Sequence, residues 1–173
     1  SLERNPGNRQ RFLALDPREF IATLERWMRV YCPDPNATVP GLPDEACAAL
    51  EQGSGVLVCA PTGAGKTVVG EFAVHLALEQ GRKCFYTTPI KALSNQKYND
   101  LVDVHGAGRV GLLTGDNAIN GDAPVVVMTT EVLRNMLYAG SPALHGLSYV
   151  VMDEVLYLAD RFRGAVWEEV IIH

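Results

Sequence analysis

The segment APTGAGKT, from Ala60 to Thr67, has the residue types and spacing of a Walker A phosphate-binding loop (P-loop), with Ala60 in place of the first glycine. Gly63 and Gly65 let the backbone turn so that its N–H groups point at phosphate oxygens. We expect Lys66 to reach the β- and γ-phosphates of a nucleoside triphosphate and the Thr67 hydroxyl to coordinate Mg²⁺. A glycine-rich turn that binds nothing is the alternative, but the apolar run before the loop and the helical pattern after it favour phosphate binding. The expected site for the cofactors ATP and Mg²⁺ therefore consists of Ala60, Pro61, Thr62, Gly63, Ala64, Gly65, Lys66 and Thr67.

An acidic pair, Asp153 and Glu154, follows the apolar run LSYVVM. Acidic pairs are common on protein surfaces, so a solvated turn is the alternative interpretation. After a buried strand, however, the pair would lie at a strand end, where α/β sheets bind their ligands. We expect Asp153 to hold Mg²⁺ together with Thr67, and Glu154 to orient or deprotonate an attacking water. Lys66, Asp153 and Glu154 are thus the expected catalytic residues of a nucleoside triphosphate hydrolase.

Short apolar runs alternate with helical patterns from Gly55 onward, and they predict the elements that must position these residues. The runs typical of buried strands are GVLVCA (Gly55–Ala60), KCFYTT (Lys83–Thr88), RVGLLTG, PVVVMTT and LSYVVMDE. Helical patterns begin near Lys66 and stop at Gly81, and they recur at Ile90–Leu101, Val132–Tyr138 and Gly164–Ile172. This order predicts an α/β fold with a mostly parallel sheet, covered on both faces, whose loops share one edge.

Residues 1–42 have a different character, because prolines punctuate them. Asp16 and Pro17 read as a helix start, and an amphipathic run from Phe20 to Met28 follows. We expect residues 1–42 to form a helical, proline-rich N-terminal extension and residues 43–173 to form one compact domain.

The composition is that of a soluble globular protein, with 47% hydrophobic and 20% charged residues in a chain of 173. The net charge of −5 argues against duplex-DNA binding driven by attraction over the whole surface, but a local groove could still hold a single strand. Four widely spaced cysteines without a Cys-x-x-Cys pair predict reduced thiols rather than a disulfide or zinc site. Since no stretch approaches the roughly 20 apolar residues of a membrane helix and the start shows no signal segment, we expect a cytoplasmic protein.

Longer strings resemble the DExH helicases of superfamily two, in particular the superkiller and exosome-cofactor group with its bacterial HelY-type members. The strings, in order from about Glu45 to the end, are GVLVCAPTGAGKT, FYTTPIKALSNQKYND, GLLTGD, VVVMTTEVLRNMLY and VVMDEV…RGAVWEEVI. This resemblance implies a RecA-like P-loop fold, which is a three-layer sandwich, and ATP-driven 3′-to-5′ translocation on RNA. It would make residues 43–173 the first of two motor lobes.

The resemblance also implies three segments that contact single-stranded RNA, each at the end of an expected strand. By position they are Thr88, Pro89, Ile90 and Lys91; Thr114, Gly115 and Asp116; and Thr129, Thr130 and Glu131, with Arg134 nearby. Hydroxyls, backbone N–H groups and helix N-termini suit contacts with phosphate oxygens that ignore base identity. From the residue types alone, such threonines and glycines would be better explained as helix caps. DNA remains an alternative track.

The sequence departs from the family pattern at two side chains and at its end. Leu156 stands where the family has a histidine that couples nucleotide state to RNA, and leucine forms no side-chain hydrogen bond. Pro43 stands where the family has a glutamine that reads adenine, so we expect weaker adenine selectivity. The chain ends at His173, before the family's Ser-Ala-Thr strand, which would lie between the Walker A and Asp-Glu strands. We therefore expect a sheet that is incomplete at its C-terminal side.

The second motor lobe is the expected missing partner, because in this family it carries arginines that stabilise the transferring phosphoryl group. Such arginines contribute about 10³ to 10⁵ in rate, so we expect residues 1–173 alone to bind nucleotide, hydrolyse it slowly and unwind nothing. A nucleotide- or RNA-binding module without motor activity is the alternative that Leu156 and Pro43 favour and that Lys66 and Asp153 oppose. A P-loop kinase or GTPase is a third interpretation, but the sequence lacks the Asn/Thr-Lys-x-Asp guanine-reading motif of GTPases.

Overall fold

The computed structural model describes residues 42–58, 66–155, 166 and 170–171. The chain divides into two compact units, Ser1–Phe72 and Ala73–His173. The first unit contains helix α3 (Leu42–Glu51), which is not among the predicted elements, and the start of α4 (Lys66–Glu79). The division between the units falls inside α4. No helix in the described ranges is long and apolar enough to cross a membrane.

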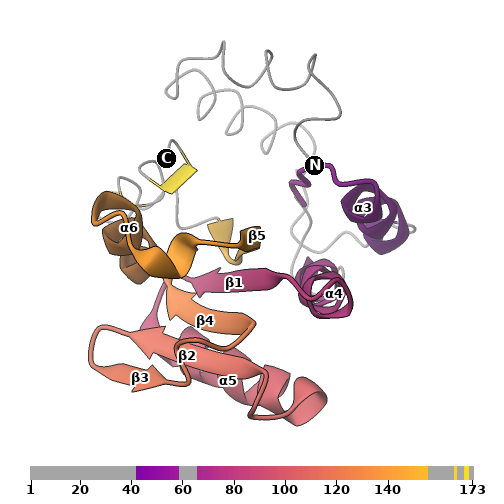
Figure 1. Cartoon of the computed structure of the whole chain (residues 1–173). Helices are drawn as coiled ribbons and strands as arrows, with labels where there is room; N and C mark the ends of the chain where they lie inside the picture. The colour runs from indigo at the N-terminus through magenta and orange to yellow at the C-terminus, as the bar shows by residue number, and fades with distance from the viewer. Residues whose placement is uncertain (1–41, 59–65, 156–165, 167–169, 172–173) are drawn as a thin grey trace. The chain divides into compact units, whose positions relative to one another are not determined.

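A five-stranded sheet forms the centre of the second unit, with the strand order β3-β2-β4-β1-β5 (Figure 1). The strands are β1 (Lys83–Thr88), β2 (Val110–Thr114), β3 (Asn117–Ile119), β4 (Val125–Thr129) and β5 (Leu147–Met152). β1 is parallel to both β4 and β5, and β2 is parallel to β4, whereas β3 runs antiparallel to β2. The predicted mostly parallel sheet is confirmed.

The register brings the carboxyl ends of four strands to the same edge of the sheet. Thr88 at the end of β1 lies opposite Thr129 at the end of β4, and Thr87 lies opposite Met152 at the end of β5. Leu113 of β2, one residue before its end, lies opposite Met128. The segments that follow these four strands therefore emerge side by side, as expected for parallel strands joined by right-handed crossovers.

Helices cover both faces of the sheet, because alternate residues of each strand project to opposite sides. On one face Tyr86 of β1 packs in a core with Leu101 of α5 (Lys91–His105) and Val74 of α4. On the other face Phe85 packs in a second core with Leu133 of α6 (Thr130–Tyr138). All five side chains are at most 2% exposed. The second unit is thus a three-layer α/β sandwich.

Most of the predicted elements are confirmed in the described part of the chain. The strand predicted at Lys83–Thr88 has those bounds as β1, and the runs RVGLLTG, PVVVMTT and LSYVVMDE contain β2, β4 and β5. The predicted helices are α4, α5 and α6, and Gly81, with φ of 62°, follows the end of α4. Val166, Val170 and Ile171 are helical, whereas the rest of the helix predicted at Gly164–Ile172 and the extension at 1–41 lie outside the described residues.

The prediction of a strand at Gly55–Ala60 is wrong for the residues that the structure describes, because Gly55 to Val58 have no regular secondary structure. A strand persists only where a neighbour satisfies its backbone N–H and C=O groups, and no described strand pairs with this segment. β5 pairs with β1 alone, so its outer edge is open among the described strands. Val150 in the middle of β5 is 45% exposed. β5 is therefore the outermost described strand on this side of the sheet.

Candidate functional site

The three segments that were expected to contact RNA meet in one cavity of about 540 Å³ at the carboxyl edge of the sheet. Each segment follows a different strand, namely β1, β2 and β4. The residues that line the cavity are Pro89, Ile90, Lys91, Gly115, Asp116, Thr129, Thr130, Glu131 and Val166. Arg134 is not among them; its guanidinium donates to Asn135 Oδ1 at 3.2 Å and lies 4.0 Å from Glu131.

An ion pair spans this cavity between the segments after β1 and β2. Lys91 Nζ donates a hydrogen bond to Asp116 Oδ2, and the Thr114 hydroxyl donates to Asp116 Oδ1 at 3.1 Å. The hydrogen bond from Lys91, followed by that from Thr114, lowers the pKa of Asp116 below its usual value. Both charged side chains are about half exposed or more, at 49% for Lys91 and 65% for Asp116, so solvent reaches the pair.

Buried hydroxyls fix the backbone on which the cavity is built. Thr88 Oγ1 donates to the carbonyl oxygen of Ile90 at 3.1 Å and lies 2.7 Å from the Ser94 hydroxyl. Thr130 Oγ1 in turn donates to the carbonyl oxygen of Thr88 at 3.3 Å, which ties the start of α6 to the end of β1. Thr88, Ser94 and Thr130 are at most 2% exposed. The side chains of Thr88 and Thr130 therefore hold the backbone at the carboxyl edge of the sheet through buried hydrogen bonds.

The two helices that begin at this edge differ in how they are capped. The Thr129 hydroxyl accepts a hydrogen bond from the Val132 N–H at 3.4 Å, so the capping interpretation of this threonine describes its contact in the structure. The N-cap of α5 is Ile90, which has no side-chain cap hydrogen bond. The first N–H groups of a helix have no partner within the helix and carry its positive dipole end. The start of α5, beside Lys91, thus has the character of an anion-binding position.

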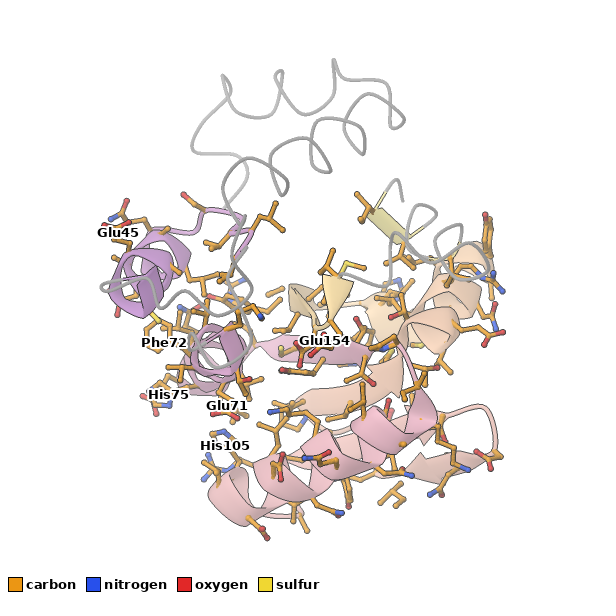
Figure 2. The ribbon with its side chains drawn as sticks, turned by 180° about the vertical axis from the view of Figure 1, so that it is seen from behind. Glu45, Glu71, Phe72, His75, His105 and Glu154 are labelled. Carbon is orange, nitrogen blue, oxygen red and sulfur yellow. The ribbon has the colours of Figure 1, made fainter. Side chains whose placement is uncertain are left out.

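Asp153 lies directly after β5 and its carboxylate is held by two hydrogen bonds. The Tyr86 hydroxyl donates to Asp153 Oδ2 at 2.8 Å, and the Glu154 N–H donates to Asp153 Oδ1 at 2.9 Å. The Asp153 N–H continues the sheet pairing by donating to the Thr87 carbonyl oxygen at 2.9 Å. Glu154 (labelled in Figure 2) is exposed and has φ of 57°, a left-handed conformation that is unusual for glutamate.

Lys66 and Thr67 are the first two residues of α4, and neither an Asp nor a Glu occupies the first turn of that helix. The positive end of the α4 dipole is therefore not neutralised by acidic side chains of its own first turn. Ala60 to Gly65 lie outside the described residues. Thr67 carries a hydroxyl and Asp153 a carboxylate, and each is an oxygen ligand of the kind that Mg²⁺ prefers. Among the described residues, no group of three or more His, Cys, Asp or Glu side chains could hold a metal by itself.

The pattern that describes DEAD/DEAH box helicases matches residues 43–173 of this chain. The chain belongs to this family. The resemblance to DExH helicases is therefore confirmed, and the chain is homologous to ATP-dependent RNA helicases.

Curated relatives of this helicase chain are much longer than the part that they share with it. A protein named Probable helicase HelY from Mycobacterium leprae is 78% identical over 128 residues, which are 74% of this chain and 14% of that protein. Antiviral helicase SKI2 from Saccharomyces cerevisiae is 52% identical over 128 residues, which are 74% of this chain and 10% of that protein. A crystal structure of a hypothetical ATP-dependent RNA helicase from Sulfolobus tokodaii has a TM-score of 0.60 at 24% identity, covers 76% of this chain and 40% of that one, and shows the RecA-like fold alone.

Two features of the carboxyl edge of the sheet were not predicted from the sequence. Tyr86 lies in the run KCFYTT, for which only a strand was predicted, yet its hydroxyl donates a hydrogen bond to Asp153. A buried tyrosine hydroxyl usually finds a partner, and that rule was the signal available in the sequence. Ser94, three residues after Lys91 in α5, was not singled out, although its hydroxyl holds Thr88 at the cavity edge.

Proposed function

We propose that this chain is the ATP·Mg²⁺-binding first motor lobe of a 3′-to-5′ RNA helicase that holds single-stranded RNA by its backbone. The observation that carries the proposal is the shared cavity of the segments after β1, β2 and β4, on the edge where Asp153 and Glu154 follow β5. Membership of the DEAD/DEAH box family supports an ATP-driven motor. The name of a 53% identical relative, ATP-dependent RNA helicase mtr4 from Schizosaccharomyces pombe, supports RNA as the track.

RNA would lie along the cavity with its phosphates toward Lys91 and the start of α5. The positive charge of a lysine attracts phosphate whatever the base, and helix N–H groups donate to phosphate oxygens. The Gly115 backbone and the polar residues of the third segment, Thr129, Thr130 and Glu131, line the remaining wall. This arrangement suits a motor that must move along any sequence.

We assign phosphate binding to the loop Ala60–Thr67 and Mg²⁺ binding to Thr67 together with Asp153. The metal, when bound, neutralises charge on the β- and γ-phosphates. Lys66 would hold the same phosphates, and Glu154 would accept a proton from the attacking water. Because the chain spans 14% of its HelY relative, we propose that a second lobe elsewhere in the protein supplies arginines for the transition state. We also propose that the open edge of β5 pairs with a further strand of the protein.

The decisive experiment compares the full-length protein with two variants in an ATPase assay with and without single-stranded RNA. Glu154→Gln should bind Mg²⁺·ATP and lose turnover, whereas Lys66→Ala should lose the thermal stabilisation that Mg²⁺·ATP gives. Continued hydrolysis by Glu154→Gln would assign the base elsewhere, and an unchanged melting shift in Lys66→Ala would remove the phosphate-loop assignment. The same ATPase assay with single-stranded DNA of the same sequence tests whether RNA is required or DNA also stimulates hydrolysis.

A second function, nucleotide or RNA binding without motor activity, is favoured by Leu156, which replaces the family's coupling histidine. The two functions differ in whether RNA raises the ATPase rate. If RNA does not stimulate the full-length protein and Leu156→His introduces stimulation, the protein is a degenerate relative rather than a motor.

A further inference from the structure

Tyr86 and Asp153 come from neighbouring parallel strands, and the register of these strands explains why they meet. Tyr86 of β1 lies opposite Val151 of β5. Since side chains alternate along a strand, Asp153, two residues after Val151, projects to the same face of the sheet as Tyr86. The hydrogen bond of 2.8 Å from the Tyr86 hydroxyl to Asp153 Oδ2 is the result of this diagonal pairing.

The Tyr86 ring is fixed from its other side by α5. Tyr86 is 1% exposed and packs in the core that also contains Leu101. Lys97 of α5 places its Nζ 5.5 Å from the centroid of the Tyr86 ring, within the range of a cation–π contact, and Lys97 itself is 8% exposed. These contacts hold the ring in the orientation in which its hydroxyl donates to the Asp153 carboxylate.

The two hydrogen bonds on Asp153 leave room for a cation. Each carboxylate oxygen accepts one of them, Oδ2 from Tyr86 and Oδ1 from the Glu154 N–H. A carboxylate has about four lone-pair positions, so each oxygen retains one that can bind a metal. Partners of this kind orient a metal-binding carboxylate, and their loss typically costs about 10- to 100-fold in metal affinity or activity.

We propose that Tyr86 is a positioning residue that fixes the Asp153 carboxylate for Mg²⁺, with Lys97 and the β1 core holding the Tyr86 ring in place. The proposal rests on the proposed role of Asp153 as a metal-binding residue. A purely structural tyrosine would contribute to folding but would leave the affinity for a divalent cation unchanged.

The test measures cation binding directly in the full-length protein. Mn²⁺, used in place of Mg²⁺, is titrated in the presence of a non-hydrolysable ATP analogue, and free Mn²⁺ is followed by electron paramagnetic resonance. Tyr86→Phe removes the hydroxyl and keeps the ring over Lys97, and it should weaken Mn²⁺ binding about 10-fold. Its affinity for the same nucleotide in EDTA should equal that of the unchanged protein.

Tyr149→Phe is the matched control. Tyr149 lies in β5 and packs against the same core as Tyr86, but its hydroxyl donates to Gln80 Oε1 at 3.0 Å. This variant should bind Mn²⁺ as the unchanged protein does. An equal loss of cation affinity in Tyr149→Phe, or a loss of nucleotide affinity in EDTA for Tyr86→Phe, would show a general effect on folding and overturn the proposal.

Asp153→Asn separates the failure of this proposal from the failure of the proposed function. If Asp153→Asn loses Mn²⁺ and Tyr86→Phe does not, Tyr86 has no positioning role although Asp153 still binds the metal. If Asp153→Asn binds Mn²⁺ normally, the metal role of Asp153 is wrong, and the role of Tyr86 is wrong with it.

Discussion

Lys91 and Asp116 line the same cavity, and their ion pair joins the segment after β1 to the segment after β2. Both residues lie where the resemblance to DExH helicases places contacts with RNA. A phosphate of the RNA backbone and the Asp116 carboxylate would therefore compete for the same ammonium group. This competition gives the acidic residue a measurable influence on RNA affinity.

The first prediction is that Asp116→Asn binds single-stranded RNA more tightly than the unchanged protein. The substitution releases Lys91 from its partner and removes a negative charge from the cavity. Water screens an exposed ion pair, so its loss should raise the affinity only about two- to fivefold. Fluorescence anisotropy with a labelled oligoribonucleotide at fixed salt measures the change.

Asp103→Asn is the control for net charge, because Asp103 is exposed on α5 and does not line the cavity. It should leave the affinity almost unchanged. Weaker RNA binding by Asp116→Asn would mean that Asp116 orients Lys91 for phosphate rather than competing with it.

The second prediction concerns the salt dependence of RNA binding by Lys91→Gln. Each cation that neutralises a phosphate of a single strand contributes about 0.7 to the slope of log K against log salt concentration. Lys91→Gln should therefore bind more weakly and show a slope that is smaller by about 0.7. The measurement is a series of binding isotherms over a range of KCl concentrations.

Lys83→Gln is the control for this experiment, because Lys83 lies at the opposite end of β1 and donates to the Ala143 carbonyl oxygen at 3.1 Å. Its slope should equal that of the unchanged protein. If the slope of log K against log salt concentration decreases equally in both variants, RNA binding does not depend on the carboxyl edge of the sheet.

Much of the fold could be predicted from the sequence because the central strands are buried on both faces. β4 (Val125–Thr129), for example, is buried at its first four residues, and its sequence VVVMT is an almost continuous apolar run. Gly55–Ala60 has the same apolar pattern and was predicted as a strand, but its described residues, Gly55 to Val58, form no strand. Apolar patterning reports a tendency to be buried, whereas a strand also needs a partner for its backbone, which a local sequence pattern does not reveal.

The site was only partly predictable for a related reason. The strand-end positions of Thr88, Thr114 and Thr129 follow from the order of the elements, and the cavity shows that their segments meet. The bond between Tyr86 and Asp153 depends on which strands are neighbours and in what register. β1 and β5 are far apart in the sequence, so neither spacing nor residue type indicates this pair.

The third prediction is that Gly111→Ala destabilises the fold by about 1–3 kcal/mol. A Cβ atom at Gly111 would lie 2.1 Å from the backbone oxygen of Asn120, which is far inside contact distance. Asn120 cannot move away at low cost, because its side-chain amide donates to the carbonyl oxygens of Ala107 and Gly108 at 3.3 Å each. Denaturant unfolding measures the loss. Gly108→Ala, where a Cβ atom has no neighbour within 4 Å, should remain within about 0.5 kcal/mol of the unchanged protein.

The fourth prediction concerns the thiol of Cys84, which is 0% exposed in the core beneath α5. Burial raises the pKa of Cys84 from 9.0 to about 12, so the folded protein keeps the thiol protonated where an unfolded chain would ionise it. The stability that this group contributes is fully present below pH 9 and is lost as the pH rises toward 12. Between pH 9 and 10 the unfolding free energy should fall more steeply than in Cys84→Ala, with a limiting difference of about 1.4 kcal/mol per pH unit.

Alkylation with iodoacetamide, read by mass spectrometry, provides an independent measurement of the same thiol. Cys84 should react only as fast as the protein unfolds, because the thiolate is the nucleophile and burial suppresses it. Cys47, which is half-buried, should react faster under native conditions. Rapid labelling of Cys84 at pH 8 in the folded protein would show that the core formed by β1, α4 and α5 opens locally.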